Sequence, residues 1–151
     1  MEYIEGPKPG PEGVNPFLQA LEAGDDREAQ ILHRAEHSFL ILNKFPYNAG
    51  HLLVLPYREV PELDDLEPEE RADLMESITF GKGLLQKALN PDGFNIGFNF
   101  GASAGAGIPS HLHAHIVPRW NGDTNFMPVL GNTRVLPQSL QAMYDRLAQF
   151  V

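Results

Sequence analysis

The stretch HLHAHIVPRW, residues 111–120, holds three of the six histidines of the chain at alternate positions. Apolar residues separate them and two β-branched residues follow, a pattern typical of a β-strand. Because successive side chains of a strand point to opposite faces, His111, His113 and His115 are predicted to share one face. With a rise of about 3.3 Å per residue, neighbouring rings stand about 6.6 Å apart on a stiff platform. The apolar residues expected in the core behind them are Leu112, Ala114 and Ile116.

Further apolar runs predict an antiparallel sheet with few helices. The other predicted strands are residues 29–35, 37–43, 51–56 and 93–100. Helices are predicted at residues 15–24, 66–90 and 137–150, and loops at residues 44–50, 101–110 and 119–133. Because the strands come in hairpin-like runs with one long helix inserted, the predicted fold class is α+β, with an antiparallel sheet and a C-terminal helix.

The ends and faces of the predicted helices carry specific signals. Asn15 is a candidate N-cap of the first helix, and Gly24 lies just past its end. In the longest helix Pro68 suits an early position, and acidic residues fill the first turn. Apolar residues recur on one stripe of this helix and of the last helix, so both are expected to pack on the sheet. The stripe residues are Leu74, Ile78, Leu85 and Leu89, and then Leu140, Tyr144 and Leu147.

A chain of 151 residues is long enough for one domain with a proper core. Residues 1–16, rich in proline and glycine, are expected to form an extended arm before a single domain at residues 17–151. The sequence shows no apolar run long enough to span a membrane and no charged-then-apolar leader. We therefore expect a cytoplasmic protein without a membrane partner.

Charge and cysteine content exclude several classes of function. The net charge is −9 and nothing resembles a basic footprint, so DNA and RNA are not expected as partners. A small anionic substrate stays open if positive groups gather at one site. The chain has no cysteine, which excludes disulfides, thiolate nucleophiles and cysteine zinc sites.

The row of histidines admits three interpretations. The rings can be surface residues of a half-exposed strand. A His-x-His pair can share a zinc ion, but the outer rings are about 13 Å apart on a straight strand, so a carboxylate or His51 would have to join. Finally, a neutral imidazole is a good nucleophile near pH 7 and forms a covalent phosphoramidate, while a second ring on the same face binds the phosphoryl oxygens. Arg119, just beyond the run, can add positive charge or can be a solvated surface residue.

The loop before the histidines consists of small residues. Its segment GASAG, residues 101–105, matches the G-x-S-x-G nucleophile elbow. That elbow requires a helix after it, whereas Ile108, Pro109 and the histidine strand follow here. No lysine follows as in a P-loop. Two accounts remain: an ordinary tight loop, or a loop whose backbone N–H groups curl around an anion.

The run from His111 to Val117 resembles the signature of the histidine triad (HIT) family, His-φ-His-φ-His-φ-φ with φ apolar. Upstream, FLILNKFPYNAGHLLVLP, residues 39–56, resembles the two-strand hairpin of that family. The resemblance extends over about residues 31–119. It implies a HIT-like α+β antiparallel sheet, normally a homodimer, that binds nucleotides and transfers or hydrolyses nucleotidyl groups.

The resemblance also implies roles for four histidines. His113 is similar to the nucleophile of the family, and His115 to its phosphate-binding and leaving-group partner. His111 is similar to the residue whose backbone carbonyl orients the nucleophile. His51 is similar to the upstream histidine that supports this network, and its alternative role is a turn residue that begins a strand.

The same resemblance makes Asn43 a ribose contact and Asn99 a phosphate-side contact. One position departs from the family pattern: hydrolases of the family usually carry a glutamine four residues before the first triad histidine, where this chain has Gly107. With a loop that is one residue longer and the tail VPRWNGDTNFMP, residues 117–128, the glycine resembles the small bacterial HIT proteins that act as diadenosine tetraphosphate phosphorylases. Trp120 in that tail is expected to stack on a base, to seal a subunit contact or to fill a core position.

These features together predict phosphorolysis of diadenosine tetraphosphate to ATP and ADP through a nucleotidyl-His113 intermediate. Gly107 leaves a space for inorganic phosphate, with the Ser103 or Ser110 hydroxyl and loop amides as candidate donors. The alternatives are a HIT-type hydrolase of dinucleoside polyphosphates or nucleoside phosphoramidates, and a nucleotide- or metal-binding module without turnover. No cofactor is assigned apart from Mg²⁺ as a candidate companion of the nucleotide. The expected partners are the nucleotide, phosphate and further copies of the chain, in a homodimer or a larger homo-oligomer.

Overall fold

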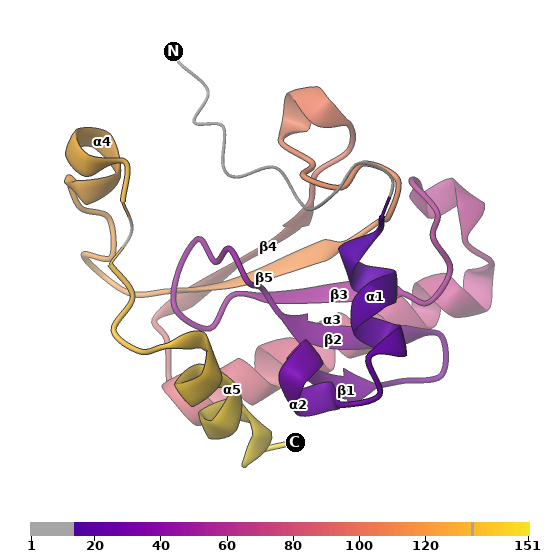
Figure 1. Ribbon diagram of the computed structural model, residues 1–151, viewed down its shortest axis with the longest axis horizontal. Coiled ribbons are helices and arrows are strands. Elements are labelled where there is room, and N and C mark those ends of the chain that lie inside the picture. The colour runs from indigo at the N-terminus through magenta and orange to yellow at the C-terminus, as the bar shows by residue number, and fades with distance from the viewer. Residues whose placement is uncertain (1–13, 134) are drawn as a thin grey trace.

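The computed structural model describes residues 14–133 and 135–151 and shows a five-stranded antiparallel sheet flanked by helices (Figure 1). The strand order is β1-β2-β3-β5-β4. The strands are β1 (Ile31–Arg34), β2 (Ser38–Leu42), β3 (Leu52–Pro56), β4 (Gly93–Phe98) and β5 (Ala114–Arg119). The helices are α1 (Pro16–Glu22), α2 (Asp26–Ala29), α3 (Pro68–Leu89), α4 (Met127–Gly131) and α5 (Leu140–Ala148), with 3₁₀ turns η1 (Leu63–Asp65) and η2 (Ala102–Ala104).

The predicted α+β class and antiparallel sheet are confirmed. Every predicted strand run contains a strand, and the three predicted helices are α1, α3 and α5. The arm expected at residues 1–16 falls mostly on residues 1–13, which lie outside the described residues. The division into an arm and one domain therefore stays a prediction.

The position of the histidines relative to β5 differs from the expectation. β5 begins only at Ala114, so His111 and His113 precede the strand. The amide of Leu112 donates to the carbonyl of Val60 at 2.7 Å, which ties the chain to the segment after β3 instead of to the β3 ladder. The prediction of three histidines along one strand is therefore wrong. The apolar residues between them are buried as predicted.

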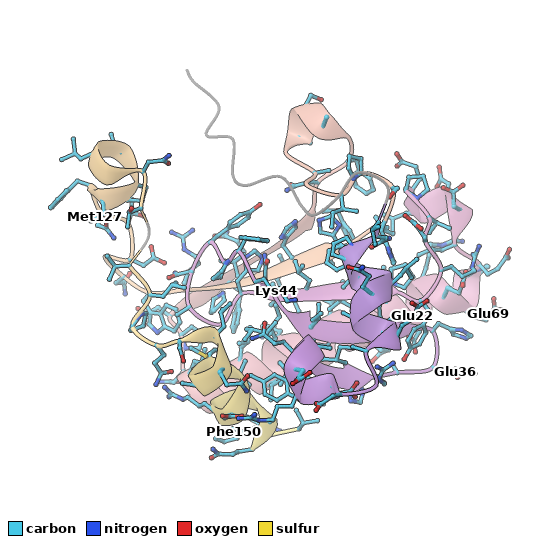
Figure 2. The ribbon with its side chains drawn as sticks, viewed as in Figure 1. Glu22, Glu36, Lys44, Glu69, Met127 and Phe150 are labelled. Atoms are coloured by element: carbon cyan, nitrogen blue, oxygen red, sulfur yellow. The ribbon has the colours of Figure 1, made fainter. Side chains whose placement is uncertain are left out.

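Residues 119–133, predicted as a loop, contain the short helix α4. Pro128 suits its first turn, and the side chain of Asn125 accepts a hydrogen bond from the Met127 amide at 2.9 Å. Met127 and Glu69 of α3 lie at opposite ends of the molecule (Figure 2). α2 also lies outside the predicted helices, and Asp25 caps it by accepting from two backbone amides.

The two faces of the sheet are covered unequally (Figure 1). α3 packs on one face across β2, β3 and β5, and the main core joins Leu40, Val54 and Ile116 to its apolar stripe. On the other face, α1 and α2 pack with a second apolar cluster that includes Phe39 and Leu53, over β1, β2 and β3. Over β4 and β5 this second face borders a cavity instead.

α3 begins and packs as its sequence predicts. Glu67 and Glu70 form a capping box, Pro68 occupies the first turn, and Asn90 ends the helix in the left-handed conformation. Of the predicted stripe, Leu74, Ile78 and Leu85 are buried, and Leu89 is partly buried against the same core. Among the described residues, none of the helices has the length and hydrophobicity that a membrane-spanning helix requires.

Two glycines of α3 provide a matched test of how closely this helix approaches the sheet. A methyl group at Gly81 would meet Ile116 Cδ1 at 2.8 Å and Leu40 Cδ1 at 3.0 Å, whereas one at Gly83 would meet nothing within 4 Å. We expect Gly83→Ala to stabilise the protein by about 0.5–1 kcal/mol through helix propensity. Gly81→Ala should be less stable than Gly83→Ala by about 1–3 kcal/mol, because buried side chains must shift. Urea unfolding measures both, and equal gains would contradict the close approach.

Candidate active site

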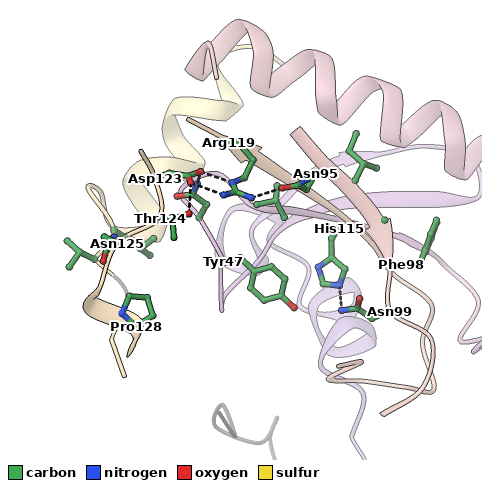
Figure 3. Close-up of a pocket in the computed structure, with 16 residues that line it drawn as sticks. Tyr47, Asn95, Phe98, Asn99, His115, Arg119, Asp123, Thr124, Asn125 and Pro128 are labelled. Carbon is green, nitrogen blue, oxygen red and sulfur yellow. Dashed lines mark hydrogen bonds and ion pairs between the residues drawn. The ribbon is translucent and has the colours of Figure 1, made fainter. Parts of the chain in front are cut away.

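A cavity of about 510 Å³ lies on the open face of β4 and β5 (Figure 3). Paired positions of the two strands share this face, since Asn95 lies opposite Val117 and Gly97 opposite His115. The loop after β2 adds a wall through Tyr47, and the segment around α4 adds another. Further lining residues include Asn48, Asn99, Arg119, Asp123, Asn125, Pro128, Val135 and Leu136. The cavity therefore combines a polar strand surface with apolar walls.

His113 lies immediately before β5 and is 7% exposed. Its Nδ1 lies 2.7 Å from the backbone carbonyl oxygen of His111. A carbonyl only accepts, so Nδ1 carries the proton and Nε2 keeps its lone pair. The ring is thus held in the tautomer that a nucleophile at Nε2 requires.

His115 is held by His51, the residue before β3. The Tyr47 amide donates to His51 Nδ1 at 3.0 Å, so the proton of a neutral His51 ring is on Nε2. This Nε2 donates to His115 Nδ1 at 2.9 Å, which leaves the proton of His115 on its own Nε2. The pair of rings therefore presents one N–H of His115 on the side of Asn99 and the cavity (Figure 3).

The rings of the site lie close together. The centroids of His113 and His115 are 5.0 Å apart, so one phosphoryl group can contact both. Tyr47 stacks on His115 with 5.5 Å between centroids and 15° between ring planes. Asn99 Nδ2 lies 3.5 Å from His115 Nε2, at the limit of a hydrogen bond, so Asn99 borders the ring without fixing it.

Burial lowers the pKa of all three triad histidines. For His111 and His113 desolvation is the main cause, and a hydrogen bond to a backbone carbonyl opposes it in each case. For His115, desolvation and the neighbouring His113 lower the pKa to about 4. The three rings are therefore neutral near pH 7, and the lone pair of His113 is available at that pH.

Asn43 supports the His51–His115 pair. Its Nδ2 lies 3.3 Å from His51 Nδ1, and its Oδ1 accepts from the Phe45 amide at 2.9 Å. Asn43 is not among the residues that line the 510 Å³ cavity. Its expected contact with a ribose stays a prediction.

Arg119 borders the cavity, but its guanidinium is already paired. It donates to both carboxylate oxygens of Asp123, at 2.6 and 2.8 Å, and to Asn95 Oδ1 at 2.6 Å. The Arg119 hydrogen bond, helped by the Trp120 amide, holds the pKa of Asp123 well below its usual range. The charge of Arg119 is therefore largely compensated before any anion binds.

Trp120 lies away from the histidine cavity. It lines a second cavity of about 360 Å³, together with Leu89 at the end of α3 and Met143 and Arg146 of α5. This position places the indole between secondary-structure elements and apart from the rings of the triad.

The small-residue loop before β5 uses several of its own amides. Those of residues 104–106 donate to carbonyl groups within the loop. The Ser110 hydroxyl donates to Glu59 at 2.7 Å, and Ser110 does not line the cavity. Ser103 and Gly107 are exposed, and a methyl group at Gly107 would meet nothing within 4 Å. Space for a side chain is therefore present at Gly107.

Sequence reasoning missed three residues that contact the triad. Tyr47 stands in a segment predicted only as a turn, although an aromatic residue four positions before His51 was a usable signal. Asn15 lies 2.9 Å from a nitrogen of His111, and Phe17 packs on the rings of His111 and His113. These two contacts span more than ninety residues and have no local sequence signal.

The chemistry of the site is that of neutral imidazole groups. Within residues 14–133 and 135–151, no cluster of three or more histidine, aspartate or glutamate side chains is placed to hold a metal ion. His51 and His115 are joined by a direct hydrogen bond. The arrangement instead suits attack by His113 Nε2 on an electrophile that the His115 N–H polarises.

The site combines an antiparallel sheet with the hydrogen-bonded rings of His51 and His115 and the neighbouring ring of His113. A family model described as "HIT domain" matches residues 25–122, and the chain belongs to the HIT family. It is 40% identical over 128 residues to "AP-4-A phosphorylase" of Mycobacterium tuberculosis, a match covering 85% of this chain and 65% of that protein. It is 38% identical over 95 residues to "Bis(5'-nucleosyl)-tetraphosphatase (asymmetrical)" of Schizosaccharomyces pombe, covering 63% of this chain and 52% of that protein. The chain thus spans less than two thirds of the length of either relative.

Solved structures share the fold. A hypothetical histidine triad nucleotide-binding protein of Sulfolobus tokodaii superposes with a TM-score of 0.68 at 25% identity, covering 89% of this chain and 87% of that one. A zinc-bound histidine triad family protein of Mycobacterium smegmatis also gives a TM-score of 0.68, at 24% identity, with 88% of each chain covered.

The lowered pKa of His115 predicts a pH-dependent contribution to stability. In an unfolded chain a histidine has a pKa of about 6.5, whereas burial lowers that of folded His115 to about 4. Between these values only the unfolded chain binds the proton, so stability falls as the pH drops through this range. Relative to His115→Gln, which does not titrate and can still accept from His51, the wild type should lose unfolding free energy between about pH 6.5 and pH 4. Urea unfolding at several pH values measures the difference, and parallel curves would contradict the lowered pKa.

Proposed function

We propose that the protein is an enzyme that transfers a nucleotidyl group from a dinucleoside polyphosphate to His113. The observation that carries this proposal is the 2.7 Å hydrogen bond from His113 Nδ1 to the His111 carbonyl, which leaves Nε2 as the free lone pair. The lowered pKa keeps that lone pair available near pH 7. The names of the two relatives, a phosphorylase and a tetraphosphatase of dinucleoside polyphosphates, support this substrate class.

In the proposed first step, His113 Nε2 attacks the α-phosphorus of diadenosine tetraphosphate. The bond from this phosphorus to the oxygen bridging to the β-phosphate breaks, ATP leaves, and AMP stays bonded to His113. The N–H of His115 Nε2 donates to the phosphoryl oxygen or to the leaving oxygen, where negative charge develops. His51 keeps His115 in this donating tautomer through the 2.9 Å hydrogen bond between the two rings.

Trapping the intermediate tests this step. Acid-quenched wild type incubated with diadenosine tetraphosphate should carry one AMP adduct, measured by intact mass, and His113→Ala should carry none because it lacks the nucleophile. His115→Ala should still form the adduct, about 10²–10³-fold more slowly, because one donor to the developing charge is lost. Normal turnover by His113→Ala would overturn the assignment, and a wild type that binds nucleotide without adduct or product would indicate a binding module.

We further propose that inorganic phosphate, in place of water, attacks the nucleotidyl-histidine. The phosphate oxygen forms a bond to the phosphorus of bound AMP, the P–N bond breaks, and ADP leaves while His113 regains its lone pair. The net reaction converts diadenosine tetraphosphate and phosphate into ATP and ADP. Gly107 supports this proposal, since it offers no side-chain amide to position water and leaves open space around its Cα. Ser103 and the loop amides outside residues 104–106 are the candidate phosphate donors.

A product assay with and without phosphate separates the two outcomes. We expect ATP and ADP in a phosphate-dependent reaction, whereas AMP and ATP at the same rate in phosphate-free buffer would identify a hydrolase. Gly107→Gln should lower the use of phosphate relative to water, because the amide fills the space and can position water. The backbone tolerates this change, since φ of Gly107 lies outside the left-handed region. Gly83→Gln on α3, which also has open space, is the matched control and should leave the product ratio unchanged.

The charge of the cavity bears on the metal requirement. Arg119 is paired with Asp123, and His115 is neutral, so these lining groups offer little uncompensated positive charge to a polyphosphate. We propose that Mg²⁺ enters bound to the phosphates of the substrate and supplies that charge.

A second copy of the chain is the proposed partner, in a homodimer or a larger homo-oligomer. β4 is an edge strand, and its outer edge has no partner strand among the described residues. Ile96 and Phe100 at this edge are 43% and 40% exposed. An exposed edge strand with apolar side chains is a template for pairing with another chain. The proposed location is the cytoplasm.

A further inference from the structure

The first turn of α1 is attached directly to the histidine triad. Asn15, the N-cap of α1, accepts from the Phe17 amide through Oδ1 at 2.9 Å. Its Nδ2 lies 2.9 Å from His111 Nδ1. The ring of Phe17 meets the His111 ring edge-on at 5.6 Å and the His113 ring at 5.5 Å between centroids. A helix far from the triad in sequence therefore contacts its first two rings.

Both nitrogens of the His111 ring are engaged, and the ring is fully buried. Nε2 lies 2.8 Å from the carbonyl oxygen of Pro56, so Nε2 donates. In the neutral ring Nδ1 then has only a lone pair, and the Asn15 amide N–H donates to it. Loss of this donor would leave a buried acceptor without a partner, at a cost well above that of an exposed group.

His111 in turn sets the state of His113. The backbone carbonyl of His111 accepts a hydrogen bond from the Nδ1–H of His113, with 2.7 Å between nitrogen and oxygen. This bond leaves the lone pair of His113 on Nε2. The side chain of His111, fixed between Asn15 and Pro56, anchors the residue that carries this carbonyl. Asn15 therefore acts on His113 through a single intervening residue, His111, whose carbonyl accepts the hydrogen bond from His113.

Capping of α1 does not by itself require an asparagine. Serine, threonine and aspartate also accept from the second or third amide of a helix. Only a side-chain amide combines an acceptor at one end with an NH₂ donor at the other in this short, planar geometry. Ser110 and Asn15 both lower the pKa of the exposed Glu59 carboxylate, so Asn15 lies close to this group as well. The amide of Asn15 is therefore oriented by the Phe17 amide at one end and by the His111 ring at the other.

We propose that Asn15 is a positioning residue of the nucleotidyl-transfer step, which holds His111 in the Nε2–H tautomer and, through the His111 carbonyl, aims the lone pair of His113 Nε2 at the substrate. The inference rests on the proposed role of His113 as the nucleophile. It adds α1, an element outside the triad segment and the β2–β3 hairpin, to the residues that position the site.

The test is Asn15→Asp, which keeps the N-cap acceptor and nearly the same shape but removes the donor to His111 Nδ1. We expect kcat on diadenosine tetraphosphate to fall about tenfold or more, with KM little changed, because Asn15 orients the ring and does not contact substrate. ¹H–¹⁵N spectra of the imidazole rings should show His111 Nδ1 as a bare acceptor in the wild type and protonated in the variant. The pH profile of kcat should change as well, because a carboxylate then faces His111, with Glu59 and His113 nearby.

Two further variants complete the test. Asn15→Ser keeps the cap but is too short to reach His111, so it should also lower kcat, and it replaces Asn15→Asp if that variant does not fold. Asp25→Asn makes the reverse exchange at the N-cap of the neighbouring helix α2, away from the triad, and should leave kcat and the imidazole spectra unchanged. Wild-type kcat in both Asn15 variants, or a protonated His111 Nδ1 in the wild type, would overturn the proposal.

Failure of the proposed function would have a different signature. In that case the wild type itself would not turn over dinucleoside polyphosphates. The imidazole spectrum of His113 would then be the measurement that tests the positioning role of Asn15. That role stands if Asn15→Asp lowers the fraction of His113 protonated at Nδ1, and it falls if the His113 spectrum is unchanged.

Discussion

A neutral imidazole ring has one N–H and one lone pair, so a hydrogen bond at either nitrogen fixes the state of the other. Burial keeps the three triad rings neutral, so this rule applies to each of them. Backbone groups then determine which ring nitrogen carries the proton. The carbonyls of Pro56 and His111 each accept a hydrogen bond from one ring N–H, and the Tyr47 amide donates a hydrogen bond to His51. Because these groups belong to the main chain, the protonation pattern depends on the sheet and its loops keeping their register.

Patterns between sequence neighbours predict much of this fold, because alternation and amphipathic stripes are local properties. The sheet and its three longer helices follow from them, whereas the roles expected of His113 and His115 come from the resemblance that HLHAHIV carries. The partners of the rings do not follow, since Asn15 is 96 residues and Pro56 is 55 residues from His111. Even the start of β5 depends on a distant group, the Val60 carbonyl that holds the chain before the strand. α4 depends on the proline in its first turn and on Asn125, which precedes the N-cap and accepts a hydrogen bond from the Met127 amide, and these are weak signals in a sequence.

Glycines in this chain meet different requirements. At Gly50 and Gly81 a Cβ would meet Leu89 at 2.5 Å and Ile116 at 2.8 Å, and Gly50 also has a positive φ, so packing and backbone demand the glycine. At Gly107 neither demand exists. A side chain can therefore be introduced at Gly107 without rebuilding the fold, unlike at Gly50 and Gly81.

The helical layer over the second face of the sheet ends before β4 and β5, and the 510 Å³ cavity takes its place. A ligand that fills this cavity covers Val117 of the sheet together with Pro128, Val135 and Leu136 of the facing segment. It therefore completes a layer that the chain itself leaves unfinished. Removing this apolar surface from water lowers the heat capacity, as closing a core does when a protein folds. Ligand binding in this cavity therefore shares two thermodynamic properties with folding. Its heat-capacity change is negative, and the melting temperature rises with ligand concentration.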